Sequence, residues 1–600
     1  MLQDFILSIL HASPSVRDTK SYLKSFGVRK PQPAVSVRRT LDSKNTLGTS
    51  KLEIPIATDT ASLSEHLTNK QIESILDPVH RHTALVKIQG PFNDRQLESI
   101  ARGMVYLQKL GLVSVIVVER DDWTRGDEHE RSDVIDEAGR VVKALEEQGA
   151  RARPLLQAIA RLGPKPDDVL PSNSKGRVSG TTMPIMDPPE AHASREDLNV
   201  IRCALRVGEI PVLAPFALDS KCRAVRIAAN DVVAALARGM VEAAEHDSPS
   251  STDFDLTPLR LMVINREGGI PSYARSGLPH LLVNLSSEVQ HISETFQADW
   301  RTSHPTALAN LRLAQTCLSY MPKTSSAVVV SHRSPRSLIA NLITNKPAHS
   351  SSLPHALLSG PKAITPHTPT IIRHGLPIRV IRSPAEIDRE RMTSLLEQSF
   401  GRTLNAEAFY ARLDAALDFC IVAGDYAGAA VVTNENEPNS TLAPMAYLDK
   451  FAVLPEHQGD GTVDFLWVAL HDESYGLGLA SALNPNPGGM QGRGTGRDLV
   501  WRSRSNNPVN KWYFERSSGH MRIGKDRYWS MFWCDAEERL AQRERILKER
   551  VEGAEGAEWG AIAGGKKRWG VPGMSFVEDD EVGRAEYWAR IVEAVPSSWT

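Results

Sequence analysis

The sequence predicts an α/β protein in which a doubly wound domain precedes an α+β domain, and three observations lead to this fold class. From about residue 61, buried strands alternate with amphipathic helices, as they do in βαβ units. Residues 347–370 are rich in Pro, Ser and His and have no hydrophobic period, which is typical of a linker. After the linker, the runs 419–426 and 428–435 predict an antiparallel pair of strands. We therefore expect a basic segment at 1–60, the doubly wound domain at 61–346, a linker at 347–370, the α+β domain at 371–545 and a tail at 546–600.

The first domain opens with a βαβ unit. Buried strands are expected at 82–90 (HTALVKIQG) and 112–122 (LVSVIVVERDD), with an amphipathic helix between them. Near-continuous apolar runs of this kind predict a parallel sheet that is covered on both faces. Further elements are expected as strands at 209–218, 259–268 and 280–285, a helix at 226–244, and a helix, strand and helix over 301–345.

The second domain is organised around residues 445–470, MAYLDKFAVLPEHQGDGTVDFLWVAL. The first half has the composition of a buried strand, and the apolar residues of the second half follow helical spacing, at Val463, Leu466, Trp467 and Leu470. The turn between them, 457–462, contains two glycines. Glycine lets the backbone approach a ligand closely, and the N–H groups at a helix N-terminus favour an anion such as a pyrophosphate. The alternative is an ordinary turn from a strand into a helix.

The composition excludes several classes of protein. Of the 600 residues, 41% are hydrophobic and 24% are charged, as in ordinary globular proteins. The formal net charge of −2 provides no overall field for nucleic acid or a membrane surface, and no apolar run reaches the roughly 20 residues of a membrane-spanning helix. We therefore expect no nucleic-acid or membrane partner. The five cysteines form no C-x-x-C pair and the 18 histidines form no HExxH, so we predict no metal site.

The first 50 residues are basic and contain few acids. Leaders that are rich in Arg and Ser and poor in acids are typical of organellar transit peptides. A solvated basic helix is the alternative for this stretch.

Two sequence motifs of the second domain resemble the acetyltransferase domain of the mitochondrial N-acetylglutamate synthase family. They are YLDKF at 447–451 and WRSRSNNPVNKWYF at 501–514. The resemblance implies the Gcn5-related acetyltransferase fold, whose acetyl-CoA loop reads Gln/Arg-x-x-Gly-x-Gly/Ala. Gln458 and Gly461 match this pattern, whereas Val463 stands where a small residue is usual. Acetyl-CoA is therefore expected as the co-substrate, bound at Val453, Gln458, Gly459, Asp460, Gly461 and Thr462.

The same resemblance implies an L-glutamate site, with contacts from Arg402, Lys450, Phe451, Arg502, Arg504 and Asn507. Arginine forks suit carboxylates, and Arg502 and Arg504 share one face of their strand. The alternative for this pair is a solvated face of an edge strand. Tyr513 is expected to protonate the CoA thiolate and Tyr447 to order the water or amine during deprotonation, although each tyrosine could instead be a core aromatic.

The first domain resembles the amino-acid kinase fold, because IAANDVVAALA places Asn230 and Asp231 at a helix start as in that family. A working kinase of this class needs a lysine followed by paired glycines after its first strand. Here Lys87 and Gly90 are followed by Pro91, which offers no N–H to a phosphate. We expect an inactive kinase fold that is kept for regulation or assembly.

The resemblance as a whole implies an enzyme of the mitochondrial matrix that acetylates L-glutamate in the first step of arginine biosynthesis. L-arginine is expected as an allosteric effector, the chain as a homo-oligomer, and an acetylglutamate kinase as a further partner. One alternative is a catalytically weak, arginine-sensing regulatory subunit of an acetylglutamate kinase complex, which Val463 would favour. Another is a protein-lysine acetyltransferase, which would need an acidic groove where this candidate site is basic.

Overall fold

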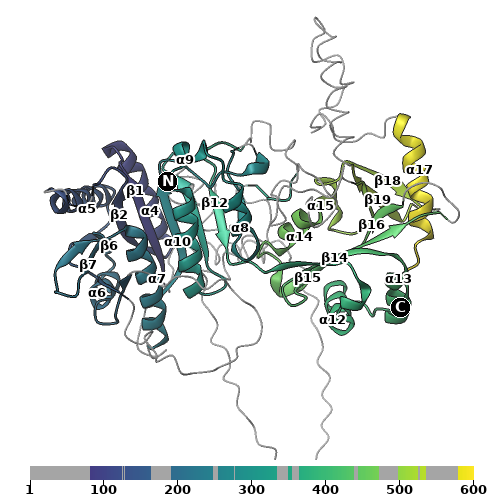
Figure 1. Ribbon diagram of the computed structural model, residues 1–600, viewed down its shortest axis with the longest axis horizontal. Coiled ribbons are helices and arrows are strands. Elements are labelled where there is room, and N and C mark those ends of the chain that lie inside the picture. Colours follow the sequence, from purple (N-terminus) through teal and green to yellow (C-terminus); the bar gives the residue numbers. More distant parts are fainter. Residues whose placement is uncertain are drawn as a thin grey trace, which may run out of the picture.

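A computed structural model describes residues 81–124, 126, 129–163, 191–246, 254–275, 277–333, 347, 349–353, 364–437, 444–471, 497–524, 527–535 and 579–599. These residues form two domains, each built on its own sheet (Figure 1). The predicted basic segment at 1–60 and the last helix expected within 301–345 lie outside the described residues.

An eight-stranded sheet forms the centre of the first domain, in the order β10-β12-β11-β9-β1-β2-β6-β3. Its strands are β1 (Arg81–Gly90), β2 (Leu112–Arg120), β3 (Ala152–Leu155), β6 (Ile210–Leu213), β9 (Phe254–Asn265), β10 (Leu282–Asn284), β11 (Ser326–Ser331) and β12 (Thr370–Arg373). Strands β3, β6, β2, β1, β9 and β11 pair in parallel, as the apolar runs predicted, and β12 pairs antiparallel with β11.

Helices cover both faces of this sheet, so the predicted doubly wound architecture is confirmed. One face packs against α4 (Asp94–Lys109) and α5 (Glu130–Glu147). The other packs against α6 (Asn199–Arg206), α7 (Ala229–Glu245), α8 (Leu285–Glu294) and α10 (Ala307–Tyr320), and the short α9 (Trp300–Ser303) precedes α10. A smaller sheet of order β5-β4-β7-β8 lies beside it, formed by β5 (Ala191–His192), β4 (Ala160–Leu162), β7 (Phe216–Leu218) and β8 (Ala224–Arg226).

The second domain has a seven-stranded sheet of order β13-β14-β15-β16-β17-β19-β18. The strands are β13 (Ile378–Ile381), β14 (Leu417–Ala423), β15 (Gly428–Glu435), β16 (Met445–Val453), β17 (Leu499–Arg504), β18 (Gly519–Ile523) and β19 (Trp529–Cys534). All pairs are antiparallel except β16 with β17, which gives the α+β class that was predicted.

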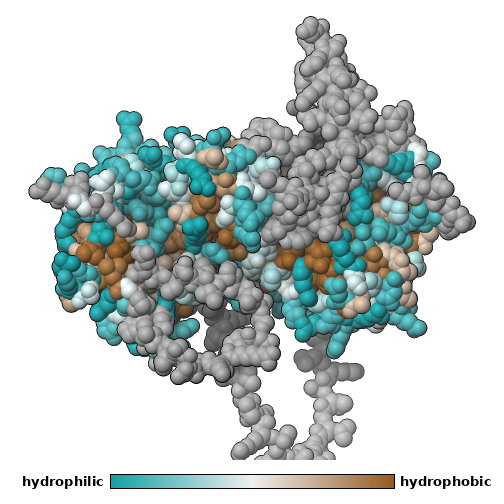
Figure 2. All heavy atoms as spheres, in the orientation of Figure 1, coloured by the Kyte–Doolittle hydropathy of each residue, from teal (hydrophilic) through white to brown (hydrophobic). Residues whose placement is uncertain are grey.

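The two faces of this second sheet have different covers. On one face lie α14 (Thr462–His471) and α15 (Asn510–Phe514). On the other lie α12 (Arg389–Phe400), α13 (Ala406–Ala416) and α17 (Asp579–Ala594). On the side of the molecule seen in Figure 2, hydrophobic residues gather along the middle of both domains, and hydrophilic residues dominate the upper and lower rims.

Several elements differ from their expected positions. The strand expected at 209–218 is two strands in different sheets, since Pro215 between them cannot donate a ladder hydrogen bond. The strand expected at 280–285 ends at Asn284, whose side chain accepts from Ser286 N and caps α8.

Two segments bear on the domain boundaries. Strand β12, which begins at the last residue of the expected linker, completes the first sheet between β10 and β11. Helix α17, in the expected tail, packs on the second sheet. We propose that the first domain extends through Arg373 and that the tail belongs to the second domain.

Candidate functional site

The candidate site lies where β16 and β17 diverge. These two strands pair in parallel only at Ala446 with Leu499 and at Tyr447 with Val500. From Leu448 to Val453, the described strands pair with β16 only through β15, so no described strand lies along its other edge. An open strand edge can bind the amide groups of an extended ligand. The splayed edge therefore offers a place for a pantetheine arm.

A β-bulge at Asp449 decides which way the neighbouring side chains point. Val431 pairs with Lys450 whereas Val432 pairs with Leu448, so Asp449 is the extra residue. Since an extra residue switches the faces of a strand, Lys450 lies on the face covered by α13 and the chain end. Phe451 lies on the opposite face, with its ring 5.7 Å from that of Trp467 in α14.

The glycine loop, residues 457–462, joins the end of β16 to α14. Gly459 and Gly461 have φ angles of +102° and +89°, a backbone region that glycine adopts readily. The Gln458 amide donates to the Val453 carbonyl at 3.2 Å and ties the loop to the strand. The N–H groups of Gly459, Asp460 and Gly461 have no acceptor among the described residues. With Thr462 at the first position of α14, the loop presents several donors to an anion.

A buried ionic cluster surrounds Lys450. Its ammonium lies 3.0 Å from the Asp449 carboxylate, which also pairs with Arg412 at 2.5 Å. Burial alone would raise the pKa of Asp449, but the charges of Lys450 and Arg412 outweigh it and hold that pKa below its usual value. Burial lowers the pKa of Lys450, against the opposing effect of Asp449.

The C-terminal segment, residues 592–599, closes over this cluster. The Lys450 ammonium donates to the Ser598 hydroxyl at 3.3 Å and lies 5.8 Å from the Trp599 ring centroid. The Arg502 guanidinium donates to the carbonyls of Val592 and Val595 at 2.6 and 2.7 Å, at the end of α17. The ammonium of Lys450 and the guanidinium of Arg502 thus already have hydrogen-bond partners within the protein.

The other two predicted arginines are different. Arg504 lies on the same face of β17 as Arg502 but is half-buried, and Arg402 is exposed just after α12. Neither guanidinium has an ion-pair or hydrogen-bond partner among the described residues. Asn507 donates from its amide to the Ser503 hydroxyl at 2.9 Å. Arg402 and Arg504 are therefore the cations of this group that are available to a substrate carboxylate.

The two tyrosines lie on opposite faces of the sheet. Tyr447 packs in the cluster beneath α17, whereas Tyr513 packs its ring 5.5 Å from that of Trp501 on the α14 face. Burial raises the pKa of both hydroxyls, that of Tyr513 to about 12. Because burial raises both pKa values, both hydroxyls keep their protons near neutral pH. Neither hydroxyl has a partner among the described residues, so each can donate its proton.

In the first domain, the lysine of the expected phosphate site is engaged in a closed network. The ammonium of Lys87 lies 2.7 Å from the Glu119 carboxylate and donates to Asn230 and Asn310 at 2.6 and 3.2 Å. Asn310 in turn donates to Gln89 at 3.1 Å. Lys87 is only 1% exposed, so its charge is neutralised inside the protein.

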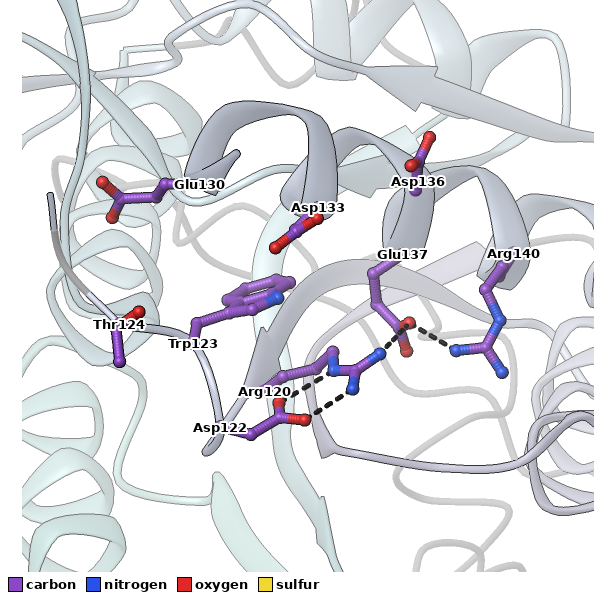
Figure 3. Close-up of a pocket in the computed structure, with 9 residues that line it drawn as sticks. All are labelled: Arg120, Asp122, Trp123, Thr124, Glu130, Asp133, Asp136, Glu137 and Arg140. Carbon is purple, nitrogen blue, oxygen red and sulfur yellow. Dashed lines mark hydrogen bonds and ion pairs between the residues drawn. The ribbon is translucent and has the colours of Figure 1, made fainter. Parts of the chain in front are cut away.

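A cavity of about 350 Å³ opens elsewhere in the first domain, between the end of β2 and α5 (Figure 3). The Arg120 guanidinium is held by Asp122 and Glu137, and Arg140 also pairs with Glu137. The cavity is lined by Arg120, Asp122, Trp123, Thr124, Glu130, Asp133, Asp136, Glu137 and Arg140. Every residue expected to contact acetyl-CoA or glutamate lies in the second domain instead.

Sequence reasoning missed the groups that support the site from a distance. Arg412 and Asp449 neutralise Lys450, and Trp599 covers it. A charged residue in the middle of an apolar strand was the available signal for Asp449. In the described part of the chain, no cluster of His, Cys, Asp or Glu could hold a metal ion. The helices that the structure describes include none long and apolar enough to cross a membrane.

Known proteins resemble this chain in sequence. Residues 380–477 and 493–551 match the family model described as NAT, N-acetyltransferase, of N-acetylglutamate synthase. Proteins named amino-acid acetyltransferase, mitochondrial, from Coprinopsis cinerea and Laccaria bicolor are each 57% identical to this chain. The first alignment covers 99% of this chain and 92% of the relative, and the second covers 100% and 99%.

Among solved structures, N-acetylglutamate synthase from Neisseria gonorrhoeae, complexed with coenzyme A and N-acetyl-glutamate, is 15% identical to this chain. The match covers 79% of this chain and 99% of that chain, with a TM-score of 0.41.

Proposed function

This chain belongs to the mitochondrial amino-acid acetyltransferase family, and from that membership we propose that it transfers the acetyl group of acetyl-CoA to the α-amine of L-glutamate. The observation that carries the proposal is the splay of β16 from β17 beyond Tyr447, directly before the glycine loop. This geometry supports a thioester held along the strand edge and a pyrophosphate held at the start of α14.

Acetyl-CoA binds through backbone groups. The pantetheine arm follows β16 to Val453, and the pyrophosphate accepts from the N–H groups of Gly459, Asp460, Gly461 and Thr462. Gln458 acts as a brace for the loop, since its amide donates to the end of the strand. The Val463 side chain replaces a small residue but leaves these N–H groups in place.

Glutamate binds on the other side of the splay, near the C-terminal segment. Arg402 and Arg504 receive its carboxylates, because their guanidinium groups have no partner among the described residues. Lys450 and Arg502 shape the pocket through the C-terminal segment, and Lys450 and Phe451 contribute their main chain at the open edge. Asn507 supports the end of β17 through Ser503.

The reaction exchanges a C–S bond for a C–N bond. The neutral amine of glutamate attacks the thioester carbonyl carbon, the C–S bond breaks, and the CoA thiolate takes the proton of the Tyr513 hydroxyl. The amine loses its proton to water, which Tyr447 helps to order from the opposite face. Tyr513 can take the role of acid because its hydroxyl has no partner among the described residues and, with a pKa that burial raises to about 12, is protonated before the thiolate forms.

The setting of the reaction is also proposed. The enzyme acts in the mitochondrial matrix in the first step of arginine biosynthesis, and L-arginine acts on it through the first domain. The closed network around Lys87 supports a regulatory rather than a phosphoryl-transferring role for that domain. A homo-oligomer and a complex with an acetylglutamate kinase complete the proposal.

The test is a substrate comparison with the purified full chain. Acetyl-CoA is supplied with glutamate, lysine or a basic peptide, and CoA release is measured with and without arginine. Glutamate should be acetylated in preference to the other two. Acetylation of the peptide would identify a protein-lysine acetyltransferase, and absence of turnover with arginine binding retained would identify a regulatory subunit.

A further inference from the structure

We infer that Arg373, in the first domain, is a positioning residue for acetyl-CoA, because its guanidinium holds the glycine loop of the second domain from behind. Its Nη1 donates to the Gly459 carbonyl at 3.1 Å. This inference rests on the proposed role of the loop in pyrophosphate binding. It adds a residue of the other domain to that site.

Arg373 has its main chain fixed in the first sheet. It is the last residue of β12, where it pairs with Ser326 of β11 and Asn284 of β10. The residue is only 8% exposed, and its guanidinium lies in the electrostatic field of Asp460 and Asp464. A buried arginine with this anchoring keeps its donors in one place, so the loop carbonyl it binds is fixed relative to the first sheet.

The consequence for the loop follows from peptide geometry. In a trans peptide, the carbonyl of one residue and the N–H of the next point in opposite directions. Because Arg373 binds the Gly459 carbonyl on one side, the N–H of Asp460 must point to the other side. That N–H has no acceptor among the described residues. Arg373 therefore orients a free donor away from the first domain, toward the side left for the pyrophosphate.

Two further observations place the loop close to the first domain. Phe465 of α14 belongs to the same buried cluster as Leu282 of β10 and Ile371 of β12. A methyl group placed on Gly461 would lie 2.9 Å from Leu282 Cδ2 and 3.7 Å from Arg373 Nη1. The loop thus rests on the edge of the first sheet, at the junction of the domains seen in Figure 1.

The segment 349–353 holds the start of α14 in a similar way. The carboxylate of Asp464 accepts from the hydroxyls of Ser350, at 2.7 Å, and Ser352. Arg516 donates to the same two hydroxyls at 2.8 Å and stacks on the Trp512 ring. Gly459 within the loop and Asp464 just after it are thus both held by residues outside the acetyltransferase sheet, so the loop conformation depends on those residues.

The test compares ligands that contain or lack the pyrophosphate. In the full chain, Arg373→Met should raise the Kd of CoA about tenfold, which corresponds to about 1.4 kcal/mol, and leave the Kd of pantetheine unchanged. Arg226→Met is the matched control, because the Arg226 side chain is similarly buried, at 9%, but pairs with Glu130 in the first domain. It should bind CoA like the wild type. Equal weakening of CoA and pantetheine by Arg373→Met, or an unchanged Kd of CoA, would overturn the inference.

A second variant covers the case in which Arg373→Met does not fold. Arg373→Lys keeps the charge but loses the planar fork, so it should raise the Kd of CoA at least about threefold, without an effect on pantetheine; an unchanged value would again overturn the inference. These measurements contain no glutamate. A wild-type chain that binds CoA normally but does not acetylate glutamate would refute the proposed substrate and leave the role of Arg373 intact. A wild-type chain that binds CoA no better than pantetheine would refute both the role of the loop in pyrophosphate binding and the role of Arg373.

Discussion

The adjacent arginines of β17 provide a sharp test of the glutamate site, because the structure gives them different tasks. Arg504 has no partner among the described residues, so Arg504→Ala would remove the proposed glutamate contact without breaking an internal one. A hydrogen bond to a charged group contributes about 1.5–3 kcal/mol, and partial exposure of Arg504 favours the lower half of that range. We expect the glutamate KM to rise about 10- to 40-fold. The acetyl-CoA KM and the melting temperature should stay near the wild-type values.

Arg502→Ala is the matched change two residues away. It removes two donors, at 2.6 and 2.7 Å, from the carbonyls that end α17, where a cation also favours the helix dipole. We expect a loss of about 2–4 kcal/mol in the free energy of unfolding, seen as a fall of about 4–10 °C in melting temperature. Steady-state kinetics gives the glutamate KM of both variants, and calorimetry gives their melting temperatures. A tenfold effect of Arg502→Ala on glutamate KM at an unchanged melting temperature, with Arg504→Ala silent, would refute this assignment.

Three more changes test other parts of the structure. Tyr513→Phe should lower kcat while both KM values change little, because the proton is needed only as the thiolate leaves; a rise in the glutamate KM alone would contradict this. Since burial raises the pKa of Tyr513 from 10.0 to about 12 in the folded chain, the unfolded chain releases this proton first. The wild type should therefore lose unfolding free energy between pH 10 and pH 12 that Tyr513→Phe keeps. Gly461→Ala should weaken acetyl-CoA binding and lower the melting temperature, because the residue has a φ of +89° and the new methyl would meet Leu282 at 2.9 Å; unchanged calorimetric binding would count against the loop. Lys87→Met breaks a buried ion pair and should cost about 3–5 kcal/mol in unfolding free energy with acetyl-transfer kinetics intact. A specific loss of activity would instead point to a direct link between Lys87 and the second domain.

The sequence predicted best those elements whose signal is local. Strands β1 and β2 are long apolar runs, and their parallel pairing followed from the helix between them. The strand, glycine loop and helix over 445–470 also appeared where expected. Each of these patterns depends on residues close together in the chain, so composition and spacing are enough to predict it.

The features that the sequence did not predict depend on contacts between residues that are distant in the chain. Strand β12 has only four residues and exists as a strand because β10 and β11 pair with it. The bulge at Asp449 turns Lys450 away from Phe451, and alternation alone cannot place such an insertion. The partners of Arg502 are main-chain carbonyls roughly ninety residues later, which no side-chain pattern encodes.

The contacts of the glycine loop bear on whether the acetyltransferase domain can act alone. A fragment that begins at residue 371 keeps Arg373 but removes β10 and β11, which hold β12 in place. It also lacks Ser350 and Ser352, which bind Asp464 at the start of α14. Phe465 and Ile371 would lose the rest of their buried cluster and face water. An effector that shifted the first sheet would act on these same contacts, so the proposed acetyl-CoA site and the proposed regulation would share one set of residues at this junction.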